Sequence, residues 1–202
     1  MKRLLLGALA TVVWAGIASA ADTRFPDWPC QQIKVPTRSV AAFWTGPSIA
    51  SVGDAWQKDD RLHDLVLRLA ARRTKLEEAE KAAADFVAGS PSDKQQRGAL
   101  LFAGLFATLS KERSEVMDGI ERFSRRQRNL RDELRTDLTA LRGLQDAAQP
   151  DDSAIEKAGD KVAWDTRVFD ERRQTIRYVC EVPGAIEHRL FALARAIQNA
   201  MN

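Results

Sequence analysis

The sequence predicts an all-α protein built on a long antiparallel helical hairpin of the coiled-coil type, with a third helix on its N-terminal side. An irregular segment rich in proline and tryptophan is predicted to precede the helices. Two observations support this. Apolar residues recur every seven positions on both sides of Pro150, which is typical of coiled coils. Four of the seven prolines lie between residues 25 and 49, where they exclude a regular helix.

Residues 1–20 are predicted to be a cleavable signal peptide. They begin with Lys2-Arg3, continue with an apolar run from Leu4 to Ile17, and end in Ala18-Ser19-Ala20, the order that secretory signals show. The alternative is a retained membrane anchor, but the run of about 14 residues is shorter than the ~20 that a spanning helix needs. We therefore expect cleavage after Ala20, a periplasmic or secreted location and no integral membrane helix.

The mature chain is close to neutral. The full sequence has 31 Lys and Arg against 28 Asp and Glu, and the signal peptide removes two basic residues and no acidic one. Proteins that bind nucleic acid through its phosphates need an excess of positive charge. The charge balance therefore excludes a general nucleic-acid partner.

Residues 21–58 are the predicted irregular segment, called the strap below. Cys30 lies in it, Cys180 lies 150 positions later, and an isolated cysteine pair in an oxidising compartment favours a disulfide. Such a bond would tie the strap across the helices and pack its tryptophans between them. Trp28, beside Pro29, and Trp44, two residues before Gly46, also fit an exposed recognition surface. Burial of their indoles decides between these interpretations.

The helical bundle is predicted to occupy residues 59–202. A first helix is expected over about 59–88, folded back on the first half of a second helix that starts with Ser90 as N-cap and Pro91 in its first turn. A third helix follows Pro150. Pro183 predicts a kink or short break near residues 182–184.

The heptad repeat fixes how the second and third helices should pair. If they fold back about Pro150, Leu134 lies opposite Val162 and Ile120 opposite Ile176, with residues 119–177 projecting as a hairpin. The same register places Leu141 opposite Ile155 and Phe106 opposite Leu190. The alternative is a break near Gly104 or Gly119, which would give a compact four-helix bundle.

Some core positions of the repeat are polar. They are Arg113, Gln127 and Asp137 on the second helix and Asp165 and Arg172 on the third. Polar residues at such positions can specify register and orientation at a cost in stability. A thin two-helix stalk, whose interface is open to solvent at its edges, would also tolerate these polar residues.

The sequence carries no recognisable catalytic, cofactor or metal motif. His63 and His188 lie among charged helical residues without partners at metal-ligand spacing, and no phosphate-binding glycine loop or nucleophile motif occurs. The acidic residues alternate with basic ones, as on solvated helix faces. We therefore expect a protein that is not an enzyme and binds no cofactor.

Two features of the hairpin are candidate partner surfaces. The run from Arg122 to Arg135 is rich in arginine, including Arg125, Arg126 and Arg128, and is either a solvated face or a docking strip for an anionic lipid, polymer or acidic partner. Trp164 and Val168 lie one turn apart and off the core positions. They are either singly exposed apolar residues or a partner site.

Together these features predict a secreted or periplasmic, non-enzymatic interaction or accessory protein, whose hairpin contacts a protein or envelope partner. A second copy of the chain is included among the expected partners. The alternative is a periplasmic chaperone-like module, or one that binds an apolar ligand in a groove between helices.

Overall fold

The structure is a computed structural model that describes residues 23–202, and the predicted signal peptide lies outside the described residues. Over this range the chain is helical without a strand, which confirms the all-α class. The α-helices are α1 (Asp60–Ala70), α2 (Leu76–Ala88), α3 (Lys94–Gln145) and α4 (Asp152–Met201), and the strap contains three short 3-10 helices, η1 (Val40–Ala42), η2 (Ile49–Ser51) and η3 (Ala55–Lys58).

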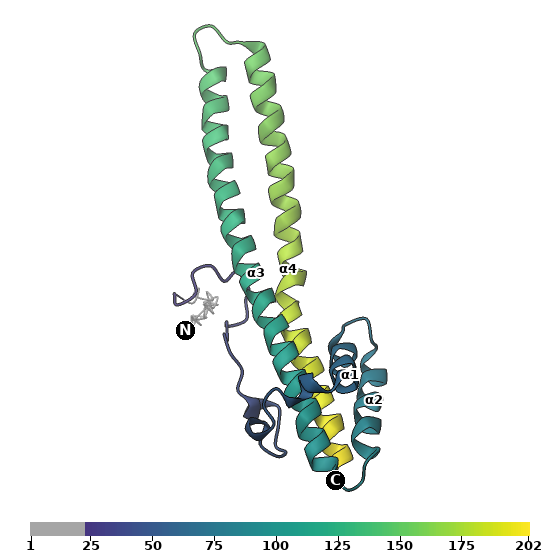
Figure 1. Ribbon diagram of the computed structural model, residues 1–202. Helices are drawn as coiled ribbons and strands as arrows, with labels where there is room; N and C mark the ends of the chain where they lie inside the picture. Colours follow the sequence, from purple (N-terminus) through teal and green to yellow (C-terminus); the bar gives the residue numbers. More distant parts are fainter. Residues whose placement is uncertain (1–22) are drawn as a thin grey trace, which may run out of the picture.

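Helices α3 and α4 form a long antiparallel hairpin that projects well beyond α1 and α2 (Figure 1). With 52 and 50 residues they are each roughly 75 Å long at 1.5 Å per residue. Helix α3 runs without interruption through Gly104 and Gly119. The alternative of a compact bundle broken at either glycine is therefore wrong, and the predicted hairpin is confirmed.

The pairing register of the hairpin follows the heptad repeat. The side-chain amide of Gln127 on α3 donates a 2.7 Å hydrogen bond to the carbonyl oxygen of Phe169 on α4. Because antiparallel helices keep a constant sum of paired positions, this contact also sets Leu134 opposite Val162. The polar core residue Gln127 therefore joins the two helices in the predicted alignment.

The predicted helix over residues 59–88 is in fact two helices, because the chain turns between α1 and α2. Each α-helix end leaves carbonyl groups without an intrahelical partner. Arg189 of α4 supplies donors here: its guanidinium bonds the carbonyl oxygens of Leu69 at 2.7 Å and Thr74 at 3.0 Å. Helix α1 then packs on α3, whereas α2 packs chiefly on α4. The apolar residues of this region keep their helical spacing across the turn, so the sequence pattern does not predict the turn.

Two predicted boundaries also differ from the structure. Helix α3 begins at Lys94, because Ser90 and Pro91 lie in a turn closed by the Asp93 amide donating to the carbonyl of Ser90 at 3.1 Å. Helix α4 continues through Pro183 without a break. Buried neighbours on both sides, Cys180 and Ile186, hold this segment in the helix despite the missing N–H.

The main hydrophobic core lies at the base, where the strap, α1 and α2 cover the lower ends of the hairpin (Figure 1). Trp44 stacks on Phe102 with ring centroids 4.3 Å apart. Gly104 lets the strap approach α3, because a Cβ there would lie 2.9 Å from the Trp56 ring. The strap therefore acts as part of the core and not only as its cover.

The projecting part of the hairpin has a much thinner core. Among residues 119–177 the buried apolar side chains are Ile120 and Leu134, and the other heptad positions are partly exposed. Two helices alone can shield only the line along which they touch. Within residues 23–202, no helix is long and apolar enough to cross a membrane.

Candidate functional site

The strap is bonded covalently to the root of the hairpin. Cys30 and Cys180 form a disulfide with their Cα atoms 5.6 Å apart, as predicted. The side-chain amide of Gln32 donates to the carbonyl oxygen of Cys180 beside it. The N-terminal part of the strap is thereby held against the hairpin above the base.

Arg113 holds the middle of the strap. Its guanidinium is buried, donates to the carbonyl oxygens of Val35 at 2.7 Å and Pro36 at 3.2 Å, and lies 2.6 Å from the carboxylate of Glu187 on α4. Arg38 of the strap pairs with the same carboxylate at 2.6 Å. Burial raises the pKa of Glu187, but the hydrogen bond from Arg38 and the charge of Arg113 outweigh it and hold that pKa below its ordinary value.

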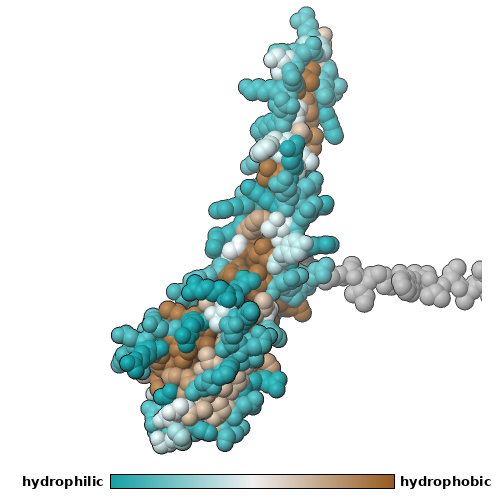
Figure 2. All heavy atoms as spheres, turned by 90° about the vertical axis from the view of Figure 1, so that its right-hand side faces the viewer, coloured by the Kyte–Doolittle hydropathy of each residue, from teal (hydrophilic) through white to brown (hydrophobic). Residues whose placement is uncertain are grey.

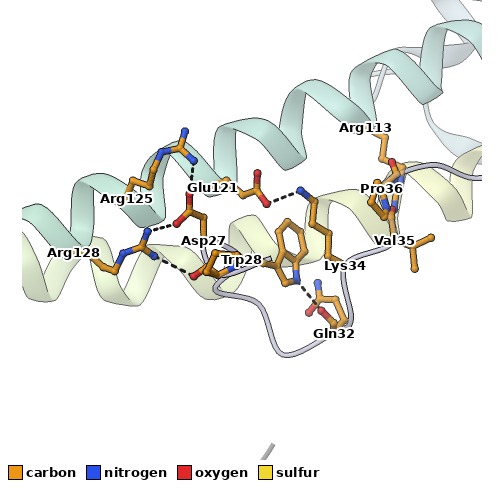
Figure 3. A network of polar contacts seen from close by, with 11 residues as sticks. Asp27, Trp28, Gln32, Lys34, Val35, Pro36, Arg113, Glu121, Arg125 and Arg128 are labelled. Carbon is orange, nitrogen blue, oxygen red and sulfur yellow. Dashed lines mark hydrogen bonds and ion pairs between the residues drawn. The ribbon is translucent and has the colours of Figure 1, made fainter. Parts of the chain in front are cut away.

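Polar contacts continue along α3 toward the tip, and Figure 3 shows them on one side of the hairpin. Lys34 lies 2.5 Å from the carboxylate of Glu121, and its ammonium group is 4.7 Å from the centroid of the Phe25 ring. The indole N–H of Trp28 donates to the carbonyl of Gln32 at 2.8 Å. Trp28 is thus half-buried and fixed within the strap.

Asp27 pairs with the two arginines of this network that lie farthest along α3 toward the tip. Its carboxylate accepts from Arg125 at 2.7 Å and from Arg128 (Figure 3). The hydrogen bond from Arg125, together with the charge and hydrogen bond of Arg128, lowers the pKa of Asp27. Two arginines of the predicted partner surface are therefore already paired with the strap. Arg126 makes no ion pair with the described residues.

Trp44 does not belong to any partner surface, and its inclusion there is wrong. Its side chain is only 5% exposed, its ring stacks on Phe102, and its indole N–H donates to the carbonyl of Pro47 at 2.7 Å. Trp56 is buried as well. The interpretation of the strap as a packed element is the one that this burial supports.

A different aromatic surface lies on α4. Trp164 is 61% exposed, and the guanidinium of Arg167 lies 5.9 Å from its ring centroid. Tyr178, which sequence reasoning missed, is 72% exposed. Val168 is half-buried between them. At 3.6 residues per turn both aromatic residues point about 160° away from Cys180, so the strap lies on the other side of α4.

Two of the remaining polar core residues, Asp137 and Asp165, form ion pairs with the same lysine near the middle of the projecting hairpin. Lys161 of α4 forms ion pairs with Asp137 of α3 and, at 2.9 Å, with Asp165 of its own helix. The hydrogen bond to Asp137, followed by that to Asp165, raises the pKa of Lys161. These contacts join the two helices at a second level above the Gln127 bond. Arg172, by contrast, is exposed.

A shallow groove of about 810 Å³ lies on the base between α2 and α4. Leu76 and Ala84 line it from α2, and Phe191, Ala192 and Ala196 from α4. Figure 2 shows apolar side chains gathered on the base and in a narrower line along the hairpin, between charged side chains. Polar and charged side chains also line the groove, namely Glu80 and Lys81 from α2 and His188, Arg195 and Asn199 from α4.

The described residues contain no group of three or more His, Cys, Asp or Glu side chains arranged to hold a metal ion. His63 packs beside the Trp56 ring at 5.6 Å, and His188 is exposed. Comparison of the chain with protein-family models, with curated proteins and with solved structures finds no match.

Proposed function

We propose that this protein is a non-enzymatic accessory protein of the cell envelope, periplasmic or secreted, whose hairpin contacts a protein or envelope partner. The observation that supports it most is the exposure of Trp164, at 61%, on the projecting part of the hairpin and of Tyr178, at 72%, near its root. Large aromatic side chains are enriched where interfaces form, because they bury much area with few rotatable bonds. A second copy of the chain is one such partner.

The strap supports the same function by fixing the direction of the hairpin. The disulfide, Arg113 and the Asp27 ion pairs hold the strap against α3 and α4 over the first turns above the base. A binding element that is already ordered loses less conformational entropy on association. The hairpin therefore presents its aromatic residues in a defined position relative to the base.

In-cell photo-crosslinking tests the proposal. A photoreactive amino acid replaces Trp164 or Tyr178 in the full chain, and the control replaces Leu67, which is 46% exposed on α1. We expect discrete crosslinked products from the two hairpin positions and none from Leu67. Identical product patterns at all three positions, or no products, would contradict the proposal. Fractionation of the same cells checks the envelope location.

The groove between α2 and α4 favours a second candidate function, the binding of an apolar ligand or of an unfolded client. Six of its eleven lining residues are Ala, Leu or Phe, and its volume of about 810 Å³ falls in the range of ligand pockets. Displacement of an environment-sensitive apolar dye by a fatty acid tests this. Ala196→Trp fills the groove and should abolish dye binding, whereas unchanged binding in this variant would exclude the groove.

A further inference from the structure

A hollow of about 360 Å³ on α3 is lined almost wholly by arginine. Its lining residues are Arg122, Arg125, Arg126, Arg128 and Asn129. They fall within eight consecutive residues, which is roughly two turns of helix, so one rigid element positions all of them. The hollow lies beside the outer end of the strap.

The strap shows what kind of group this cluster accepts. The carboxylate of Asp27 lies between Arg125 and Arg128 and receives hydrogen bonds from both (Figure 3). Guanidinium groups bind oxyanions through charge-assisted hydrogen bonds, which are stronger than those between neutral groups. An internal oxyanion thus already occupies part of the cluster.

The other two arginines have no such partner. Arg122 and Arg126, one turn apart, form no hydrogen bond or ion pair with residues 23–202. Like charges at this spacing repel each other. Of the four guanidinium groups that line the hollow, only those of Arg125 and Arg128 pair with a carboxylate, and in both cases it is that of Asp27.

We infer that Arg122, Arg125, Arg126 and Asn129 form a binding site for a phosphomonoester, either a free phosphate ester or the headgroup of a lipid. A phosphate dianion brings two charges and three terminal oxygens, which suits two unpaired guanidinium groups and the amide of Asn129. A ligand with one solvent-exposed carboxylate would gain little binding free energy from the same arginines. The inference rests on the proposed function, because it specifies a phosphate group as what the hairpin would bind on an envelope partner.

The geometry also assigns a role to Asp27. Its carboxylate shares Arg125 with the proposed site and competes with the ligand for that guanidinium. Removing the charge of Asp27 should therefore strengthen phosphate binding. Because the site is open to solvent, added salt should weaken binding strongly.

The test uses the full mature chain with three probes. They are glycerol 3-phosphate in solution, vesicles of a neutral lipid doped with phosphatidic acid, and vesicles of the same neutral lipid doped with phosphatidylglycerol to the same surface charge. Calorimetry measures the first and co-sedimentation the other two. The variants are Arg122→Gln with Arg126→Gln, and the matched control is Arg135→Gln with Arg142→Gln on the same helix outside the hollow. Circular dichroism verifies that each variant is helical.

We expect a loss of at least tenfold in affinity for the phosphomonoester probes in the first double variant and a change within twofold in the control. Asp27→Asn should bind at least threefold more tightly. Arginine-dependent binding of both phosphomonoester probes assigns the site to the phosphate group itself, and binding of phosphatidic acid vesicles alone assigns it to a lipid headgroup. No binding, equal losses in the two double variants, or equal binding of phosphatidylglycerol vesicles overturns the inference.

These results are separable from those that test the proposed function. Trp164 and Tyr178 lie on α4, whereas the arginine hollow lies on α3. Loss of crosslinking at the aromatic positions with intact phosphate binding counts against the proposed protein partner. Intact crosslinking with no phosphate binding removes the phosphate site only.

Discussion

The guanidinium of Arg113 on α3 lies 2.6 Å from the carboxylate of Glu187 on α4 and donates at the same time to two backbone carbonyls of the strap. One buried side chain therefore joins the three segments that meet at the root of the hairpin. A polar residue at a heptad core position weakens a simple two-helix seam. Here its polar atoms are satisfied by the strap, which makes the strap part of the hairpin's architecture.

Replacing Arg113 by Met should destabilise the fold by about 2 to 4 kcal/mol, since it leaves Glu187 and two strap carbonyls without their buried donor. Urea unfolding followed by circular dichroism measures this. Arg38→Ala is the control, because Arg38 is 40% exposed and its ion pair should contribute about 1 kcal/mol or less. Equal losses in both variants would show that Arg113 has no special anchoring role.

Loss of the disulfide should lower stability and release the outer strap. Cys30 and Cys180 enclose a loop of 150 residues, for which the chain-entropy model gives at most about 5 kcal/mol. We expect the Cys30→Ser, Cys180→Ser variant to unfold at lower denaturant and to expose amides of residues 25–34 to hydrogen exchange. Unchanged exchange there would mean that the polar contacts alone hold the strap.

Gly104→Ala should destabilise the protein by about 1 kcal/mol or more, although alanine is the better helix former. The new Cβ would lie 2.7 Å from Val66 and 2.9 Å from Trp56, and the overpacking outweighs the helical gain of roughly 1 kcal/mol. Gly143→Ala, where nothing lies within 4 Å, should stabilise the same helix by about 0.5 to 1 kcal/mol. Thermal unfolding of the two variants should therefore shift in opposite directions.

Acidification should loosen the strap. The pKa values of Asp27 and Glu187 lie below their ordinary values of 3.8 and 4.5, so the stability they contribute is present above those values and is lost as pH falls through the lowered ones. We expect stability to decline below about pH 4.5. Asp27→Asn should flatten part of this decline in urea titrations at pH 3 to 7, and a profile identical to that of the unchanged chain would contradict the role of Asp27.

Several features could be predicted from the sequence because they depend on local periodicity and redox chemistry. The heptad repeat determined the hairpin and its register, which the contact of Gln127 with Phe169 reproduces. The isolated cysteine pair determined the disulfide. In each case hydrophobic burial or oxidation acts on residues whose spacing is visible in the chain.

Tertiary structure alone decided the rest. The turn between α1 and α2 depends on Arg189, which comes from a helix more than a hundred residues away and satisfies carbonyls that the local sequence leaves open. Trp44 is buried because Phe102 lies under it, and Arg125 and Arg128 are paired because Asp27 reaches them. Periodicity shows which face of a helix is apolar, but whether a polar or aromatic side chain is covered depends on which distant segment packs against it.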